Sequence, residues 1–231
     1  MRGVYFYVPE AVAGVPGEPD LFAHQAIQQI EHILRGLVQI KHLGGHGLLA
    51  GILVSFGLWT VNLRVMGPDG DPSTPGEVDR ELFDRQLTAM IAARDEGLIG
   101  GIGLSSISLE HLEIALDRTD IACVQNAYNL LDRSSQPVLD ACAARGIAFV
   151  PFFPLGSGFA QDNPVLGNPV VQRAARELGF TAAQIALAWT LGVAPNVLLI
   201  PGTSSVGHLE ENLAVADIDL GEALRAELDA I

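Results

Sequence analysis

The feature that most constrains the fold is a short unit that recurs four times between Ile99 and Asn212. Each copy combines an apolar run typical of a β-strand, a small polar loop and a segment with helical spacing. The strand-like runs are Ile99–Leu104, Ile121–Gln125, Ile147–Phe152 and Asn196–Ile200. Strands that alternate with helices indicate a parallel sheet. Ligands of such sheets bind at the carboxyl ends of the strands, so the exit loops GLSS, QNAYN, PLGSG and PGTSS predict a binding face.

Helix start and stop signals are clear in this part of the chain and much weaker before it. The predicted helices are Glu77–Glu96, Ser108–Leu116, Ser135–Gly146, Asn168–Gly179, a buried Thr181–Leu191, Val206–Ala216 and Leu220–Ile231. The first 97 residues offer a helix at Leu21–Arg35 and strands at Val4–Val8, Leu37–Lys41 and Thr60–Met66. Eight strand–helix units need about 250 residues. A barrel built from this chain would therefore be incomplete or remodelled in its first half.

Charge and hydropathy narrow the range of partners. The chain has 27 acidic and 13 basic residues and a net charge of −14, which argues against nucleic-acid binding. Leu43–Leu63 is 21 residues long without a charge, but its five glycines favour buried strands over a membrane span. The start MRGVYFYVPE does not resemble a signal peptide, and Cys123 and Cys142 lack metal or redox spacing. We therefore expect a cytoplasmic protein.

Two small-residue loops suggest a phosphate site. In PGTSSVGHLEEN (Pro201–Asn212) the loop leads directly into a helix, whose first amides are unpaired and can bind an anion. The alternative is that Ser205 simply caps that helix. A second Gly-rich loop, Leu155–Gly158, follows the preceding strand. Two such loops after the last two strands are typical of the phosphate site of (β/α)₈ barrels.

The other exit loops carry groups suited to a planar polar ring. Gln125 offers a donor and an acceptor together, which suits a carboxamide, and Ser105 and Ser106 end the preceding strand. Phe152 could offer a flat face to a ring. The alternatives are ordinary loop polarity for the first three and core packing for Phe152.

The ordered set GLSS, VQNAYNLLDR, GIAFVPFFPLGSGF and IPGTSSVGHLEEN resembles the second half of an aldo-keto reductase, over roughly Glu77 to Asn212. The resemblance implies a (β/α)₈ barrel and hydride transfer from NADPH, less often NADH, to aldehydes and ketones. It implies that Ser105, Ser106 and Gln125 hold the nicotinamide carboxamide and that Phe152 stacks under the ring. The other positions implied for the cofactor are Leu155, Gly156 and Ser157 at the pyrophosphate, and Gly202, Thr203, Ser204, His208, Glu211 and Asn212 at the adenosine end.

The sequence departs from this family at several positions. Ser106 stands where the family usually has Asn, and Gly202 and His208 stand where many members have Lys and Arg against the 2′-phosphate. NADP is thus the expected cofactor, with NAD possible. Among catalytic positions, Lys41 ends a strand as the family's Lys does, Arg64 occupies its His position, and Tyr7 stands in a faint match to its Tyr motif. The alternatives for Lys41 and Tyr7 are surface or structural roles, and no counterpart of the catalytic Asp is found.

Together these features predict one barrel-like domain over residues 1–231, irregular over 1–97 and regular over 98–231. The expected activity is reduction of a small carbonyl substrate by NAD(P)H. One alternative is a catalytically impaired barrel that still binds the nucleotide. Another is a degenerate fragment that binds nothing. An open sheet edge would favour association, so we expect a homodimer with Leu48–Leu58 near the contact.

Overall fold

The computed structural model describes residues 60–65, 73–156, 163–203 and 205–231. Within these, one compact unit contains residues 60–63 and 79–102, and the other contains 64–65, 73–78 and the residues from 103 onward. The predicted elements before Thr60, and the proposed dimer contact at Leu48–Leu58, lie outside the described residues. The expectation of a single domain over the whole chain stays a prediction.

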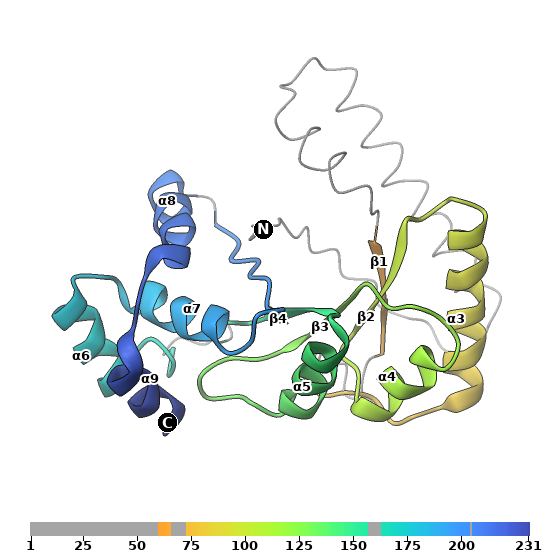
Figure 1. Ribbon diagram of the computed structural model, residues 1–231, viewed down its shortest axis with the longest axis horizontal. Coiled ribbons are helices and arrows are strands. Elements are labelled where there is room, and N and C mark those ends of the chain that lie inside the picture. Colours follow the sequence, from red (N-terminus) through yellow and green to blue (C-terminus); the bar gives the residue numbers. More distant parts are fainter. Residues whose placement is uncertain (1–59, 66–72, 157–162, 204) are drawn as a thin grey trace, which may run out of the picture. The chain divides into compact units, whose positions relative to one another are not determined.

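A four-stranded sheet has the order β1-β2-β3-β4 (Figure 1). The strands are β1 (Thr60–Arg64), β2 (Gly101–Ser105), β3 (Cys123–Ala127) and β4 (Ala148–Phe152). Strands β2, β3 and β4 pair in parallel, with Ser105 opposite Gln125 and Ala127 opposite Phe152. These four strands were predicted from the sequence, with ends that differ by two residues at most. Strands β2 and β3 are almost entirely buried, as is typical of the central strands of a parallel sheet, whereas β4 alternates buried and half-buried residues.

The predicted strand Asn196–Ile200 is wrong as a full strand. Only Val197 forms a bridge, in parallel with Phe149 of β4. The Phe149 amide donates to the Asn196 carbonyl at 2.9 Å, and the Leu198 amide donates to the Phe149 carbonyl at 2.9 Å. Pro201 then has no N–H with which to continue the ladder.

The helices follow the predicted boundaries closely. They are α3 (Arg80–Asp95), α4 (Leu109–Leu116), α5 (Gln136–Arg145), α6 (Pro169–Leu178), α7 (Ala182–Gly192), α8 (Val206–Ala214) and α9 (Gly221–Asp229), with a short 3₁₀ turn η1 (Val215–Asp217). Thr181 caps α7 and accepts from the Gln184 amide. Gly146 and Gly179 end α5 and α6 in the left-handed conformation that glycine adopts most easily. The last part of Val206–Ala216 differs from the prediction because it tightens into η1.

The core of the second unit is built around Trp189 on α7. Tyr128 stacks on its ring at a centroid distance of 6.0 Å with 4° between the planes, and Phe149 meets Tyr128 edge-on at 6.0 Å. The Trp189 indole donates to Asp229 at 2.7 Å. Arg133 lies 4.7 Å from the centre of the Trp189 ring and donates to the last carbonyls of α9. These contacts fasten the C-terminal helix to the core.

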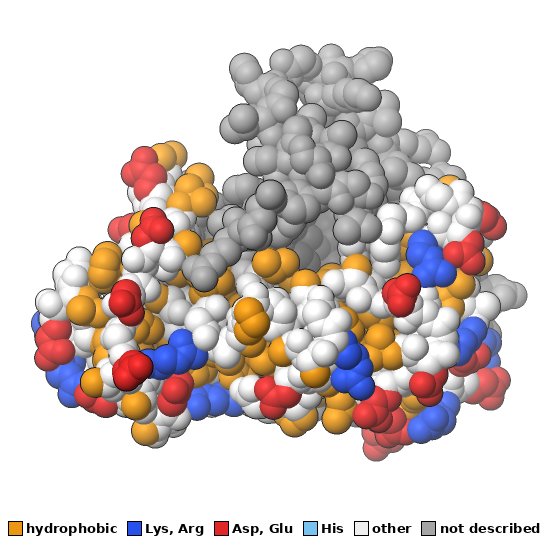
Figure 2. Space-filling view, in the orientation of Figure 1, with side chains coloured by type: hydrophobic (Ala, Val, Ile, Leu, Met, Phe, Trp, Pro, Cys, Tyr) orange, Lys and Arg blue, Asp and Glu red, His pale blue; other side chains and the backbone are white. Residues whose placement is uncertain are grey.

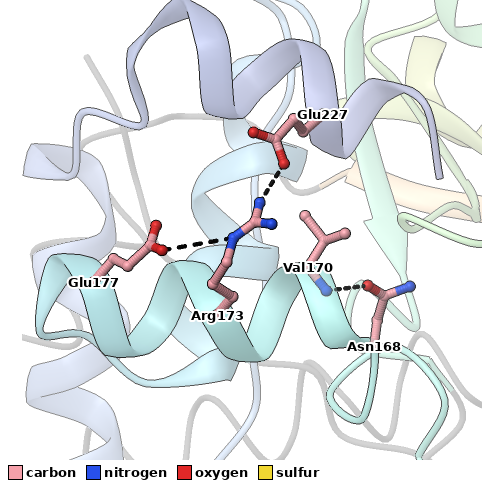
Figure 3. Close-up of polar contacts among 5 residues, drawn as sticks. All are labelled: Asn168, Val170, Arg173, Glu177 and Glu227. Carbon is pink, nitrogen blue, oxygen red and sulfur yellow. Dashed lines mark hydrogen bonds and ion pairs between the residues drawn. The ribbon is translucent and has the colours of Figure 1, made fainter.

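The C-terminal helix α9 also contacts α6 at the surface. Arg173 of α6 pairs with Glu227 of α9 and lies 3.7 Å from Glu177 on its own helix (Figure 3). Exposed ion pairs contribute about 0–1 kcal/mol, so the Trp189 contacts matter more for this helix. On the face drawn in Figure 2, acidic and basic side chains are interspersed, with no continuous basic area among the described residues. None of the described helices combines the length and apolar character needed to cross a bilayer.

One buried histidine predicts a pH dependence of stability. His111 is 1% exposed, and its Nδ1 accepts from the Ser108 amide in a capping box at the start of α4. Burial lowers the pKa of His111, and Glu110 opposes this only in part. Below about pH 6.5 the unfolded chain binds a proton that folded His111 does not, so stability should fall as the pH drops.

We expect the melting temperature to decrease from about pH 8 to about pH 5, and part of this decrease to disappear in His111→Gln. Glutamine keeps an acceptor for the Ser108 amide, because Ser-x-x-Gln is also a capping box. The parent and His111→Gln share all other histidines, so the difference between their plots of melting temperature against pH isolates the contribution of His111. Parallel curves would contradict the prediction.

Candidate functional site

The carboxyl ends of the strands bring three of the predicted residues together. Ser105 and Gln125 are paired in register, and the Ser106 amide donates to the Gln125 carbonyl at 3.0 Å. The amide of Val65, which follows β1, donates to the Ser105 carbonyl at 2.9 Å. Side chains at paired positions of a sheet share a face. The structure thus joins the GLSS and QNAYN loops at one edge of the sheet.

The hydroxyls of Ser105 and Ser106 are buried and have no hydrogen-bond partner among the described residues. An unsatisfied buried polar group costs about 1–3 kcal/mol. Ser106 also has φ +57°, a left-handed conformation that is unfavourable for a residue other than glycine. Strain and unpaired groups persist mainly at functional sites, so this corner has the properties of a binding site.

Asn126 shapes this corner, although the sequence reasoning did not single it out. Its amide group donates to the Ile107 carbonyl at 2.7 Å and to Ser135 Oγ at 3.2 Å, and its oxygen accepts from the Ile107 amide at 3.0 Å. It therefore fixes the chain directly after Ser106. The available signal was its position, since it is a second polar residue next to Gln125 inside a strand.

The segment after β4 forms a tight turn. Phe152 and Phe153 are half-buried, and their rings meet edge-on at 5.2 Å. Phe153 has φ +54°, and Gly156 has φ +81°. The Gly156 amide donates to the Phe153 carbonyl at 2.8 Å. Leu155 and Gly156 lie in this turn, and Ser157 lies outside the described residues.

The loop before α8 is arranged mainly by its own hydroxyl and amide groups. Ser205 caps α8 by accepting from the His208 amide, which is the alternative considered for this loop. Thr203 accepts from the Ser205 amide at 3.1 Å, and Asn212 donates to the Pro201 carbonyl at 3.3 Å. The Glu211 carbonyl accepts from Gln184. Gly202 and His208 are exposed, and Ser204 lies outside the described residues.

Of the three predicted catalytic residues, the structure describes Arg64. Tyr7 and Lys41 lie outside the described residues. Arg64 is exposed at the end of β1, and the residue after it bonds to Ser105. The structure therefore places Arg64 at the same sheet edge as the buried serines.

A parallel sheet with alternating helices defines an α/β protein, and in such proteins ligands bind at the strand-exit loops. Residues 68–231 match the sequence pattern of the aldo/keto reductase family. The chain belongs to that family.

Relatives and solved structures agree with this assignment. Pyridoxine 4-dehydrogenase of Escherichia coli is 43% identical over 171 residues, 74% of this chain and 56% of the relative. An aldo/keto reductase of Klebsiella pneumoniae, solved with NADP and acetate, has a TM-score of 0.61 at 26% identity and covers 74% of this chain and 58% of its own. A thermostable aldo-keto reductase solved with the inhibitor epalrestat has a TM-score of 0.60 at 29% identity, with the same coverage.

These likenesses confirm the expected (β/α)₈-barrel class, of which the described strands form a part. The chain spans about half the length of the curated relatives it matches, 56% and 46% for two of them. The described residues fit a nicotinamide dinucleotide at one end, because the Ser105 and Ser106 hydroxyls can pair with a carboxamide beside Gln125. At Gly156 a Cβ would lie 3.3 Å from Val165 Cγ2, so the packing of the turn favours glycine at this position.

Proposed function

We propose that this chain is an oxidoreductase that reduces a small aldehyde or ketone with NADPH, and with NADH as a possible substitute. The observation that carries the proposal is the pair of buried hydroxyls of Ser105 and Ser106 beside Gln125, which find no hydrogen-bond partner among the described residues. The names of the relatives support the reaction class, and the NADP complex of the Klebsiella protein supports the cofactor.

In this proposal the parts of the cofactor are bound by residues of four strand-exit loops. Ser105, Ser106 and Gln125 bind the carboxamide and orient the ring, and Phe152 covers one ring face. Leu155 and Gly156 approach the pyrophosphate through their backbone. The residues of the adenosine end are Gly202, Thr203, His208, Glu211 and Asn212, with Ser204 and Ser157 completing the two loops. A bound reduced nicotinamide supplies the hydride.

The chain's own residues must supply a proton to the carbonyl oxygen. Tyr7 is the proposed donor, and Lys41 is proposed to lower the pKa of its phenol, because a nearby cation favours the phenolate. Arg64, at the edge of the sheet beside the serines, is proposed to face the substrate side. The second candidate is a barrel that binds the nucleotide without turnover. It is favoured by the lack of a counterpart for the family's catalytic Asp.

The test is thermal stabilisation by cofactor. NADPH at about one hundred times its Kd should stabilise the fold by about 2.7 kcal/mol and raise the melting temperature, since only the folded chain offers the site. Gln125→Ala should lower the affinity for NADPH while leaving the affinity for adenosine 2′,5′-bisphosphate nearly unchanged, because the substitution alters only the carboxamide contacts. If neither NADPH nor NADH at millimolar concentration shifts the melting temperature, both candidates are wrong.

A further inference from the structure

We propose that Asn129 and Asn163 are positioning residues that hold the turn after β4 in the conformation that receives the cofactor. This β4 exit turn is the segment Phe153–Gly156. The inference rests on the proposed function, because it assigns a purpose to side chains that do not themselves belong to the predicted site. It concerns the described residues on either side of the turn.

Asn129 holds the first residue of the turn from the loop after β3. Its Nδ2 donates to the Phe153 carbonyl at 3.0 Å. Its Oδ1 accepts from the Leu131 amide at 2.9 Å and from the Asp132 amide at 3.0 Å. The side chain is 6% exposed, so these bonds are shielded from water. One amide group therefore connects two strand-exit loops.

Asn163 repeats the same arrangement on the other side. Its Nδ2 donates to the Leu155 carbonyl at 2.7 Å, and its Oδ1 accepts from the amides of Val165 and Leu166, both at 3.0 Å. In each asparagine the side-chain oxygen thus accepts from amides of its own loop, and the side-chain nitrogen donates to the β4 exit turn. The two carbonyls of the turn that accept these bonds are only two residues apart.

The turn needs such support because its backbone is strained. Phe153 has a left-handed φ of +54°, whereas the φ of +81° at Gly156 is readily adopted by glycine. A non-glycine residue in this region costs about 1–3 kcal/mol and persists only where its surroundings fix it. Within the turn itself, the Gly156 amide donates to the Phe153 carbonyl at 2.8 Å. The Phe153 carbonyl consequently accepts two hydrogen bonds, one local and one from Asn129.

The position of the turn links this support to binding. Phe152 precedes it and is proposed to cover the nicotinamide ring, while Leu155 and Gly156 are proposed to line the pyrophosphate. A loop that is already in its bound conformation avoids the entropy cost of ordering on binding. Loss of either asparagine hydrogen bond should therefore weaken binding of the nicotinamide–pyrophosphate part of the cofactor and leave binding of the adenosine end unaffected.

The experiment uses Asn129→Asp and Asn163→Asp in the full chain. Aspartate keeps the oxygen that accepts from two amides, but it replaces the donor nitrogen with an oxygen that cannot donate when ionised. Each variant should raise the Kd for NADPH about tenfold or more, since it removes one donor from a carbonyl of the turn and places a carboxylate oxygen against that carbonyl. The Kd for adenosine 2′,5′-bisphosphate should change less than about twofold.

Asn168→Asp is the matched control. Asn168 caps α6 through its Oδ1, which accepts from the Val170 amide at 2.9 Å (Figure 3). Aspartate serves equally well at that position, so the same chemical change should leave both Kd values unaltered. The added negative charge is tested by raising the ionic strength, because salt screens simple repulsion of the cofactor but does not restore a lost hydrogen-bond donor.

A second readout needs no cofactor. In the unliganded protein, amide hydrogen exchange at Gly156 should be faster in Asn129→Asp and Asn163→Asp than in Asn168→Asp. If Asn129→Asp does not fold, Asn163→Asp carries the same expectation. Two outcomes would overturn this inference and leave the proposed function standing. One is a folded variant that binds NADPH as tightly as the parent, and the other is an equal loss of affinity for NADPH and for the bisphosphate. A parent chain that binds no NADPH would overturn the proposed function as well.

Discussion

Trp189→Ala is expected to lower the free energy of unfolding by about 3–5 kcal/mol, the range measured for removing a large aromatic side chain from a core. Trp189 is 1% exposed and stacks on Tyr128, so alanine leaves a cavity beneath that ring. The variant also removes the donor to Asp229 and the ring surface under Arg133. The C-terminal helix α9 would then lose its main buried attachment.

Urea unfolding followed by far-UV circular dichroism measures this effect. Trp189→Phe should fall between the parent and the alanine variant, because it keeps a ring for Tyr128 but lacks the indole N–H. Leu178→Ala is the surface control, since Leu178 is 40% exposed and should change stability by about 0.5 kcal/mol or less. A loss below about 1 kcal/mol in Trp189→Ala would contradict the proposed role of this residue in the core.

Lys41→Met should reduce kcat by about a hundredfold or more, the scale typical of acid–base assistance. Lys41 is the only lysine in the chain, so this variant removes every lysine-dependent effect at once. The physical reason is that the phenol of Tyr7 would lose the cation that lowers its pKa and so makes it a better proton donor. NADPH affinity should barely change, because the cofactor contacts lie on the later loops.

The assay follows NADPH oxidation with a reactive aromatic aldehyde. Tyr7→Phe should be about as damaging as Lys41→Met, and the double variant should be no worse than either, because residues that act as a unit are not additive. Full activity in Lys41→Met would contradict the proposed catalytic role of Lys41 and favour the alternative of a surface residue. A parent chain that binds NADPH without oxidising it would instead support the non-catalytic candidate.

Much of the regular structure could be predicted from sequence because its signals are local. Ser108, Asn168 and Thr181 each cap a helix where the pattern placed its start, and Gly146 and Gly179 end helices as expected. Buried parallel strands are apolar on both faces, so their runs are visible without any alternation. The loops of Ser105, Ser106 and Gln125 followed from the same reasoning, because strand ends in a parallel sheet meet at one edge.

Other features depended on contacts between distant residues. The run Asn196–Ile200 has the composition of a strand, yet it forms one bridge because pairing depends on a neighbour and on the proline that follows. Asn129 and Asn163 look like ordinary loop residues until the fold brings each one to the same turn. Arg133 is 95 and 96 residues away in sequence from the two α9 carbonyls to which it donates. The sequence alone determined the helices, four of the strands and which loops carry polar groups, because those signals act over a few residues. The tertiary structure decided which polar groups find a partner among the described residues and which do not, because that depends on long-range packing.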